Sequence, residues 1–154
     1  MRKTAAFILL FCYLFLLPSC GEISESASSL LCVFAEAYGA DGIIYSPDVA
    51  EGEAGYVDSN FFRVLFGGEA DFESDYAVFL SASLEAVYEA GVFVCRDDTS
   101  LLYAEELLRD RISLLSKMGY AGSPILIRRG DTVFYSTLPD ARRAEDIWRD
   151  IKIR

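Results

Sequence analysis

The sequence contains no histidine among its 154 residues. Histidine is the commonest general base and a frequent ligand of catalytic zinc, so its absence excludes Ser-His-Asp and Cys-His nucleophile pairs and nearly all zinc enzymes. The sequence also has no other recognisable nucleophile motif. We therefore predict a protein that is not an enzyme, with no catalytic residues and no cofactor.

Basic residues are scarce in the first part of the chain. Residues 20–95 contain Arg63 alone against 14 acidic residues, whereas residues 96–154 contain 11 basic and 10 acidic residues. An acidic region of this size is repelled by the phosphates of nucleic acid and of anionic lipid. We expect an acidic domain with no nucleic-acid partner.

The N-terminus has the features of an export signal. Arg2 and Lys3 precede an apolar run from Ala5 to Leu17, which is shorter than the about 20 residues that a membrane-spanning helix needs. The sequence Leu17-Pro18-Ser19-Cys20 that follows resembles the lipobox of bacterial lipoproteins, although Pro18 replaces the small residue usual there. Simple secretion, with Cys20 unmodified, is the alternative.

The lipobox resemblance implies a location. Residues 1–19 would be a signal peptide, and Cys20 would carry a thioether-linked diacylglycerol, with palmitate among the expected fatty acids. The mature protein would then be bound to membrane lipid through Cys20, on the extracytoplasmic face of the cell membrane. Two acyl chains anchor a protein firmly, whereas one anchors it marginally.

Two cysteines remain for disulfide chemistry. Cys12 lies in the signal peptide and Cys20 is the lipidation site, so Cys32 and Cys95 are the only candidate pair in an oxidising compartment. Both have apolar neighbours, among which a reduced cysteine packs well. The sequence leaves open whether they are bonded.

Composition and apolar periodicity divide the mature chain into two parts. Residues 20–28 are small and polar, as expected of a tether, and residues 29–154 are long enough for one domain with a single core. A short strand at 43–45 and a short helix over 59–66 are weaker predictions. The stronger elements are a helix ending at Gly39, strands over 76–82 and 87–96, a helix over 99–118, strands over 124–128 and 132–137, and a final helix from Asp140.

These stronger elements follow the order helix, hairpin, helix, hairpin, helix. The simplest packing is an α+β fold, in which a small antiparallel sheet of two hairpins has its helices mainly on one face. The layout from Asp75-Tyr76-Ala77-Val78 to Thr137 resembles an uncharacterised domain family of small bacterial lipoproteins, over residues 30–150. That resemblance implies membrane-anchored export, and it implies no established activity and no functional residues.

An acidic run precedes the first hairpin. Glu69, Asp71, Glu73 and Asp75 alternate with other residues, so in an extended segment their carboxylates lie on one side, where Ca²⁺ would relieve their repulsion. The calcium helix-loop-helix motif requires Gly and Glu at fixed positions that this run does not provide. A solvated acidic loop is therefore favoured over an irregular calcium site, and no other metal site is predicted.

Two further patterns suggest functions. Arg129-Gly130-Asp131 falls at an expected hairpin tip and matches the tripeptide of integrin ligands, but turn geometry already explains Gly130 and Asp131, and arginines that flank a strand are ordinary. Paired carboxylates drawn from residues 41–75 could hydrolyse glycans.

We predict a lipid-anchored cell-envelope protein with a non-catalytic binding or accessory role, whose partner is an envelope protein or glycan. The alternatives are a carboxylate-dependent envelope enzyme acting on glycan and a solute-capture lipoprotein.

Overall fold

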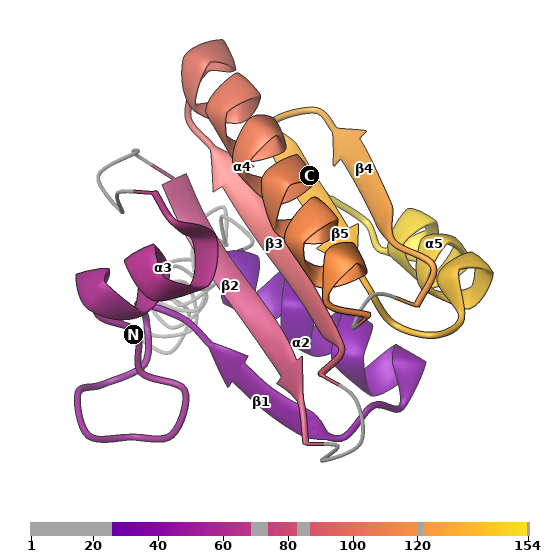
Figure 1. The fold of residues 1–154 in the computed structure, drawn as a ribbon, viewed down its shortest axis with the longest axis horizontal. Coiled ribbons are helices and arrows are strands. Elements are labelled where there is room, and N and C mark those ends of the chain that lie inside the picture. The colour runs from indigo at the N-terminus through magenta and orange to yellow at the C-terminus, as the bar shows by residue number, and fades with distance from the viewer. Residues whose placement is uncertain (1–25, 69–73, 83–86, 120–121, 154) are drawn as a thin grey trace, which may run out of the picture.

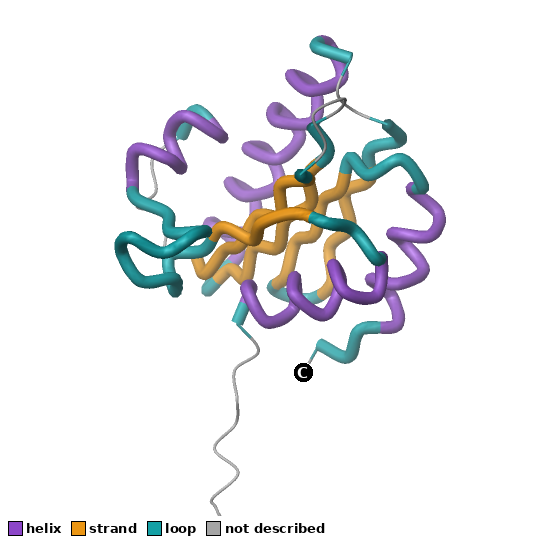
Figure 2. The backbone as a smooth tube through the Cα atoms, turned by 90° about the horizontal axis from the view of Figure 1, so that it is seen from below, coloured by secondary structure: helices purple, strands orange, loops and turns teal. Residues whose placement is uncertain are grey.

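The fold is built around one antiparallel sheet of five strands. The structure is a computed structural model that describes residues 26–68, 74–82, 87–119 and 122–153. Helices cover both faces of the sheet (Figures 1 and 2). In chain order the elements are α2 (Ala27–Tyr38), β1 (Gly42–Tyr45), α3 (Ser59–Phe66), β2 (Ser74–Ser81), β3 (Glu89–Cys95), α4 (Asp98–Lys117), β4 (Ile125–Arg129), β5 (Thr132–Ser136) and α5 (Ala141–Asp150).

The two predicted hairpins are present, and together they form four of the five strands. The sheet order is β1-β2-β3-β5-β4, with every neighbouring pair antiparallel. The second hairpin turns at Gly130, whose φ of +62° suits the first central position of a two-residue turn. It joins the first hairpin through β5, so β4 and β1 form the edges. The α+β class is confirmed, while the predicted order omitted β1 and α3.

The prediction that helices lie mainly on one face is wrong. One apolar cluster joins α2 and α5 to Ala77, Phe79 and Phe134, and another joins α3 and α4 to the opposite side chains of the same strands. All five residues of β5 are buried. The strands are continuous apolar runs without polar alternation, and strands of that kind are covered on both faces.

Helix ends follow the capping residues that the sequence predicts. Asp97 and Ser100 form a reciprocal capping box at the start of α4, and Asp140 accepts a hydrogen bond from the Arg143 amide at the start of α5. The apolar stripe of α4 is buried through Leu101, Ala104, Leu108 and Leu115. Met118, the last residue of the predicted helix over 99–118, lies just beyond α4 and is 55% exposed.

The domain begins earlier than residue 29. The Ser26 side chain caps α2, which starts at Ala27, so the last residues of the predicted 20–28 tether belong to the folded part. The Ala27 amide also donates a hydrogen bond of 2.7 Å to Oδ2 of Asp75 on β2. Residues 26–28 are small and polar, so they were predicted to belong to the tether, but they form the cap and the first turn of α2.

None of the described helices is long and apolar enough to cross a membrane.

Candidate binding groove and a buried ion pair

The outer surface between α2 and α5 contains a groove of about 550 Å³. Its volume lies within the range of 300–1,000 Å³ that is typical of ligand pockets. The groove is mainly apolar. Its lining consists of Leu30, Val33, Ala37, Ile147 and Ile151, together with Ser29, Asp150 and Lys152.

The groove exists because each helix is apolar on more than its core-facing side. Leu31 and Phe34 of α2 and Trp148 of α5 are fully buried against the sheet. Val33 of α2 points outward and remains 53% exposed, and Ile147 of α5 is half-buried. Ala37 is too small to fill the space between the two helices. An apolar hollow therefore remains open to solvent.

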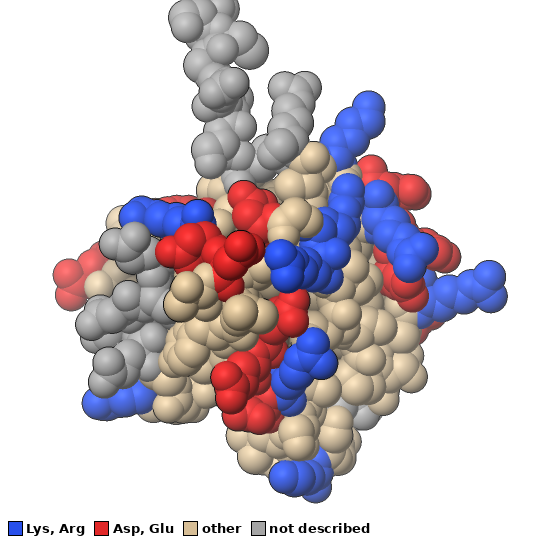
Figure 3. Space-filling model, turned by 90° about the horizontal axis from the view of Figure 1, so that it is seen from above, with Lys and Arg blue, Asp and Glu red and all other residues tan. Residues whose placement is uncertain are grey.

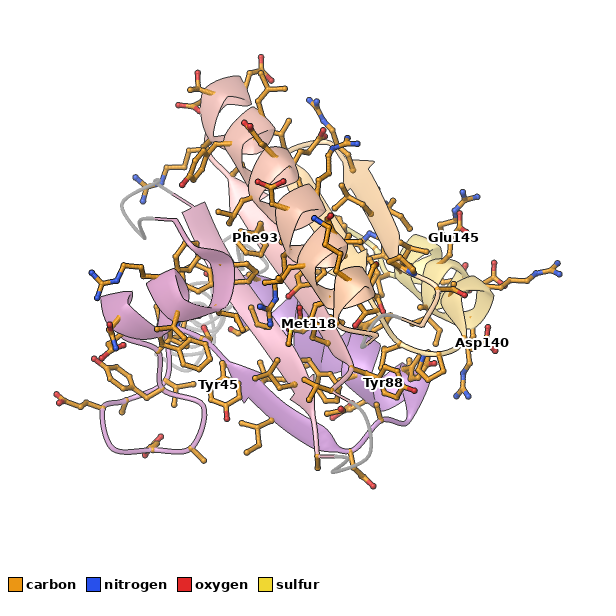
Figure 4. All side chains as sticks on the ribbon, in the orientation of Figure 1. Tyr45, Tyr88, Phe93, Met118, Asp140 and Glu145 are labelled. Atoms are coloured by element: carbon orange, nitrogen blue, oxygen red, sulfur yellow. The ribbon has the colours of Figure 1, made fainter. Side chains whose placement is uncertain are left out.

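Polar contacts hold the two helices together at the end of α2. The Asp140 amide donates a hydrogen bond of 3.1 Å to Oη of Tyr38, and the Arg143 guanidinium lies 5.0 Å from the centre of the Tyr38 ring. Arg143 Nη2 also donates to the carbonyl of Ala37 over 3.4 Å. Asp140 marks the start of α5 in Figure 4. These contacts fix the width of the groove at this end.

A more polar hollow of about 400 Å³ continues the groove. It shares Ala37, Ile147 and Asp150 with the apolar part and adds charged residues of the first turns of α5. The added residues are Asp140, Arg142, Arg143 and Asp146. The complete groove therefore has a mainly apolar section and a more highly charged section that shares its lining near Ala37.

Arg129 fixes the other end of α5 from within the sheet. Its Nη1 donates to the carbonyl oxygens of Trp148 and Ile151 at 2.6 and 2.8 Å. The guanidinium is thus bound to the end of a helix, which favours a positive charge at its last carbonyls. Arg129 thus has a structural partner, which favours the turn interpretation of Arg129-Gly130-Asp131 over the integrin-like one.

The opposite face of the sheet contains a buried ion pair. Arg111 of α4 donates to Glu89 of β3 through two parallel hydrogen bonds, Nε to Oε1 at 2.7 Å and Nη2 to Oε2 at 2.9 Å. The Glu89 side chain is fully buried and the Arg111 side chain is 12% exposed. Burial lowers the pKa of Arg111, but the hydrogen bonds and the charge of Glu89 outweigh this and raise it. The pair is closed to solvent on the Glu89 side.

Tyr135 of β5 completes this buried cluster. Its ring packs over Gly91, where an added Cβ would lie 2.3 Å from a ring carbon. Burial, together with the negative charge of Glu89, raises the pKa of the Tyr135 hydroxyl well above its usual value. The hydroxyl has no hydrogen-bond partner of ordinary geometry among the described residues. Only glycine at position 91 leaves room for this tyrosine.

Of the predicted acidic site, the structure describes only Asp75, which has a structural role. Glu69, Asp71 and Glu73 lie outside the described residues, and Asp75 binds the first amide of α2. No group of three or more possible metal ligands occurs in the part of the chain that the structure describes.

Candidate carboxylates before the acidic run also have local partners. Asp58 caps α3 by accepting from the Phe61 amide, and Asp48 accepts a hydrogen bond from Ser28 Oγ. The aromatic residues of α3 pack in the core, where Phe62 is fully buried. These side chains stabilise helix ends and the core.

The disulfide that the sequence left open is not formed. Cys32 and Cys95 both lie in the described part of the chain, and no bond joins them. Cys32 is exposed on α2, whereas Cys95 is buried on the α3/α4 face, so the sheet separates them. Cys20, the predicted lipidation site, lies outside the described residues.

Comparisons of the chain with protein-family models, curated proteins and solved structures find no match. The groove was not predicted from the sequence, although one signal was available. The apolar residues of α2 include Val33 and Ala37 as well as the core-facing Leu30, Leu31 and Phe34, so its apolar stripe is wider than the core requires.

Proposed function

We propose that the protein is a lipid-anchored binding domain of the bacterial cell envelope, with the α2–α5 groove as its binding surface. Cys20 would hold the mature chain on the extracytoplasmic face of the membrane. The domain would act as a non-catalytic binding or accessory protein, and its ligand would present an apolar group to the groove.

The observation that carries this proposal is the groove itself. Its apolar section combines Leu30, Val33 and Ala37 of one helix with Ile147 and Ile151 of another, in a hollow of ligand size. Apolar surface left exposed in a concave site is typical of binding sites and is costly otherwise. Covering it would contribute about 25 cal/mol per Å² of apolar surface.

The buried Glu89–Arg111 ion pair is the other feature that could take part in chemistry, and its geometry favours a structural role. Glu89 is the fully buried carboxylate of the α3/α4 face, and both of its oxygens accept hydrogen bonds from Arg111. A general acid or base must be within reach of the substrate proton. Glu89 has no exposed surface through which a glycan could meet it, which supports binding over hydrolysis.

Binding of an apolar fluorescent probe tests the proposal. We expect anilinonaphthalene sulfonate to bind the folded protein, and Val33→Glu to abolish most of this binding by placing a charge in the apolar section. Val64→Glu is the matched control, because Val64 is an exposed valine on α3, on the other side of the sheet, with 76% exposure. Equal binding by wild type and both variants, measured by titration, would contradict the proposed surface.

A further inference from the structure

We infer that the α2–α5 groove faces the membrane and takes up one acyl chain of a bilayer phospholipid. This inference rests on the proposed function, from which it takes the anchor and the groove. It adds the orientation of the domain and the chemical class of the ligand.

The position of the groove relative to the anchor is the first argument. Ser29 lines the groove, nine residues after Cys20. An extended chain spans at most about 3.6 Å per residue, so Ser29 stays within about 30 Å of the anchored residue. The layer of α2 and α5 lies on one side of the sheet, with α3 and α4 on the other (Figure 2). The tether therefore joins the domain on the groove side.

Charge gives the second argument for this orientation. The groove layer is nearly neutral, because residues 26–40 contain Glu36 as their single charged residue and residues 139–153 contain four acidic and four basic residues. By contrast, residues 41–68, which include α3, contain five acidic residues against Arg63. An anionic membrane surface repels the acidic side and tolerates the neutral one. The neutral side is also the side with the groove.

The lining determines which ligand group fits. The side chains of Leu30, Val33, Ala37, Ile147 and Ile151 have no hydrogen-bond donors or acceptors, so a polar ligand group would lose its water without compensation. A hydrocarbon chain has no polar group to desolvate, and by entering the groove it removes the apolar lining from water. Of the two charged lining residues, Lys152 provides a cation for the lipid phosphate, beside the carboxylate of Asp150. A membrane-bound protein meets acyl chains at far higher local concentration than any other apolar group.

Quenching of tryptophan fluorescence by brominated lipid tests this inference. Trp148 is the only tryptophan, and it lies on α5 next to Ile147 and three residues before Ile151. The mature lipidated protein is reconstituted in phosphatidylcholine vesicles with either dibrominated or unmodified acyl chains. We expect the brominated chains to remove most of the Trp148 emission, because bromine quenches only at short range.

Variants separate a chain in the groove from general proximity to lipid. Val33→Glu should restore most of the emission, and so should Ala37→Phe, which fills the hollow with an apolar ring and adds no charge. Val64→Glu should be quenched like the wild type. Far-ultraviolet circular dichroism melts identify any variant that unfolds, and the second groove variant then decides the result.

Flotation of the vesicles distinguishes failure of the inference from failure of the proposed function. If the protein floats with the vesicles but its Trp148 emission is not quenched, the acyl-chain site is overturned and the anchor is left intact. The same conclusion follows if both groove variants are quenched as strongly as the wild type. That result would also be expected if the groove bound a protein partner instead. Mature protein that does not float with the vesicles overturns the anchored location itself.

Discussion

The two helical layers cover the same sheet with different chemistry. On the α2/α5 face, Phe134 and Trp148 stack with ring centroids 4.3 Å apart, and Phe34 packs edge-on to Phe134 at 4.7 Å. On the α3/α4 face, the aromatic core around Phe93 (Figure 4) shares its space with the Glu89–Arg111 ion pair. The first layer leaves an apolar groove outside, and the second encloses charge inside.

This difference indicates which side can change its contacts with solvent or ligand. A buried charge is stable only beside a partner in a fixed position, so the side chains of the α3/α4 face tolerate little rearrangement. The apolar side chains of the groove have no directional partners, so they can accept another apolar group without breaking an existing interaction. On the surface drawn in Figure 3, by contrast, Lys and Arg side chains lie beside Asp and Glu, as in exposed ion pairs of little net energy.

Breaking the buried ion pair should have the largest effect on stability. Arg111→Met leaves the Glu89 carboxylate buried without its partner, which should cost about 3–5 kcal/mol of unfolding free energy. The double variant Glu89→Leu with Arg111→Met should recover much of this loss, because two apolar side chains replace the pair. Chemical denaturation of the three proteins measures both effects. If Arg111→Met had the same unfolding free energy as the wild type, the ion pair would not stabilise the α3/α4 face.

Alkaline pH should act on the α3/α4 face with a smaller effect. Burial, with the nearby charge of Asp58, raises the pKa of Tyr76 to about 12 from the ordinary value of 10.0. The unfolded chain therefore loses the proton first, and the stabilising contribution, complete below pH 10, is lost as the pH rises from 10 to 12. With allowance for solvent screening, the loss is about 1–2 kcal/mol.

Tyr76→Phe should reduce this alkaline loss, because phenylalanine has no proton to release. Tyr38→Phe on the α2/α5 face is the control and should leave the loss unchanged. Thermal melts of both variants between pH 9 and pH 12 make the comparison. Some loss should remain, because burial also raises the pKa of Tyr135. A loss as large in Tyr76→Phe as in the wild type would show that Tyr76 does not contribute to the alkaline sensitivity.

Removing the Asp75 contact should have the smallest effect of the three. Asp75→Asn keeps the shape of the side chain but weakens the hydrogen bond to the Ala27 amide, at a cost of about 1 kcal/mol, as for other helix N-terminal contacts. Asp48→Asn is the matched control, because its hydrogen bond to Ser28 is exposed. If both variants melt at the wild-type temperature, then Asp75 does not stabilise α2.

Local chemistry explains which parts of the fold could be predicted from the sequence. The limits of α4 were predicted to within one residue, because Asp97 caps its start and Gly119 follows its end. The second hairpin was predicted because Gly130 marks its turn. The pairing of β3 with β5 joins strands that an entire helix separates in the chain. Local patterns contain no direct information about such pairings, so a sheet of two hairpins was predicted but its strand order and its edge strand β1 were not.

The site was harder to predict than the fold. The groove depends on α2 lying beside α5, and the Tyr38–Asp140 contact that links them spans 102 residues. The Glu89–Arg111 pair has the same origin, because each residue alone is an ordinary member of a strand or a helix. The predicted acidic run, by contrast, was visible in the sequence, yet its Asp75 serves a helix end.

The Asp75–Ala27 hydrogen bond also has a mechanical consequence. Any pull on the chain before Ser26 enters the domain at the first turn of α2, where this bond connects the helix to β2. β2 is hydrogen-bonded to β1 on one side and β3 on the other, so the load reaches the interior of the sheet instead of peeling an edge strand. The chain is thus linked to the interior of the sheet at the point where a tether would pull.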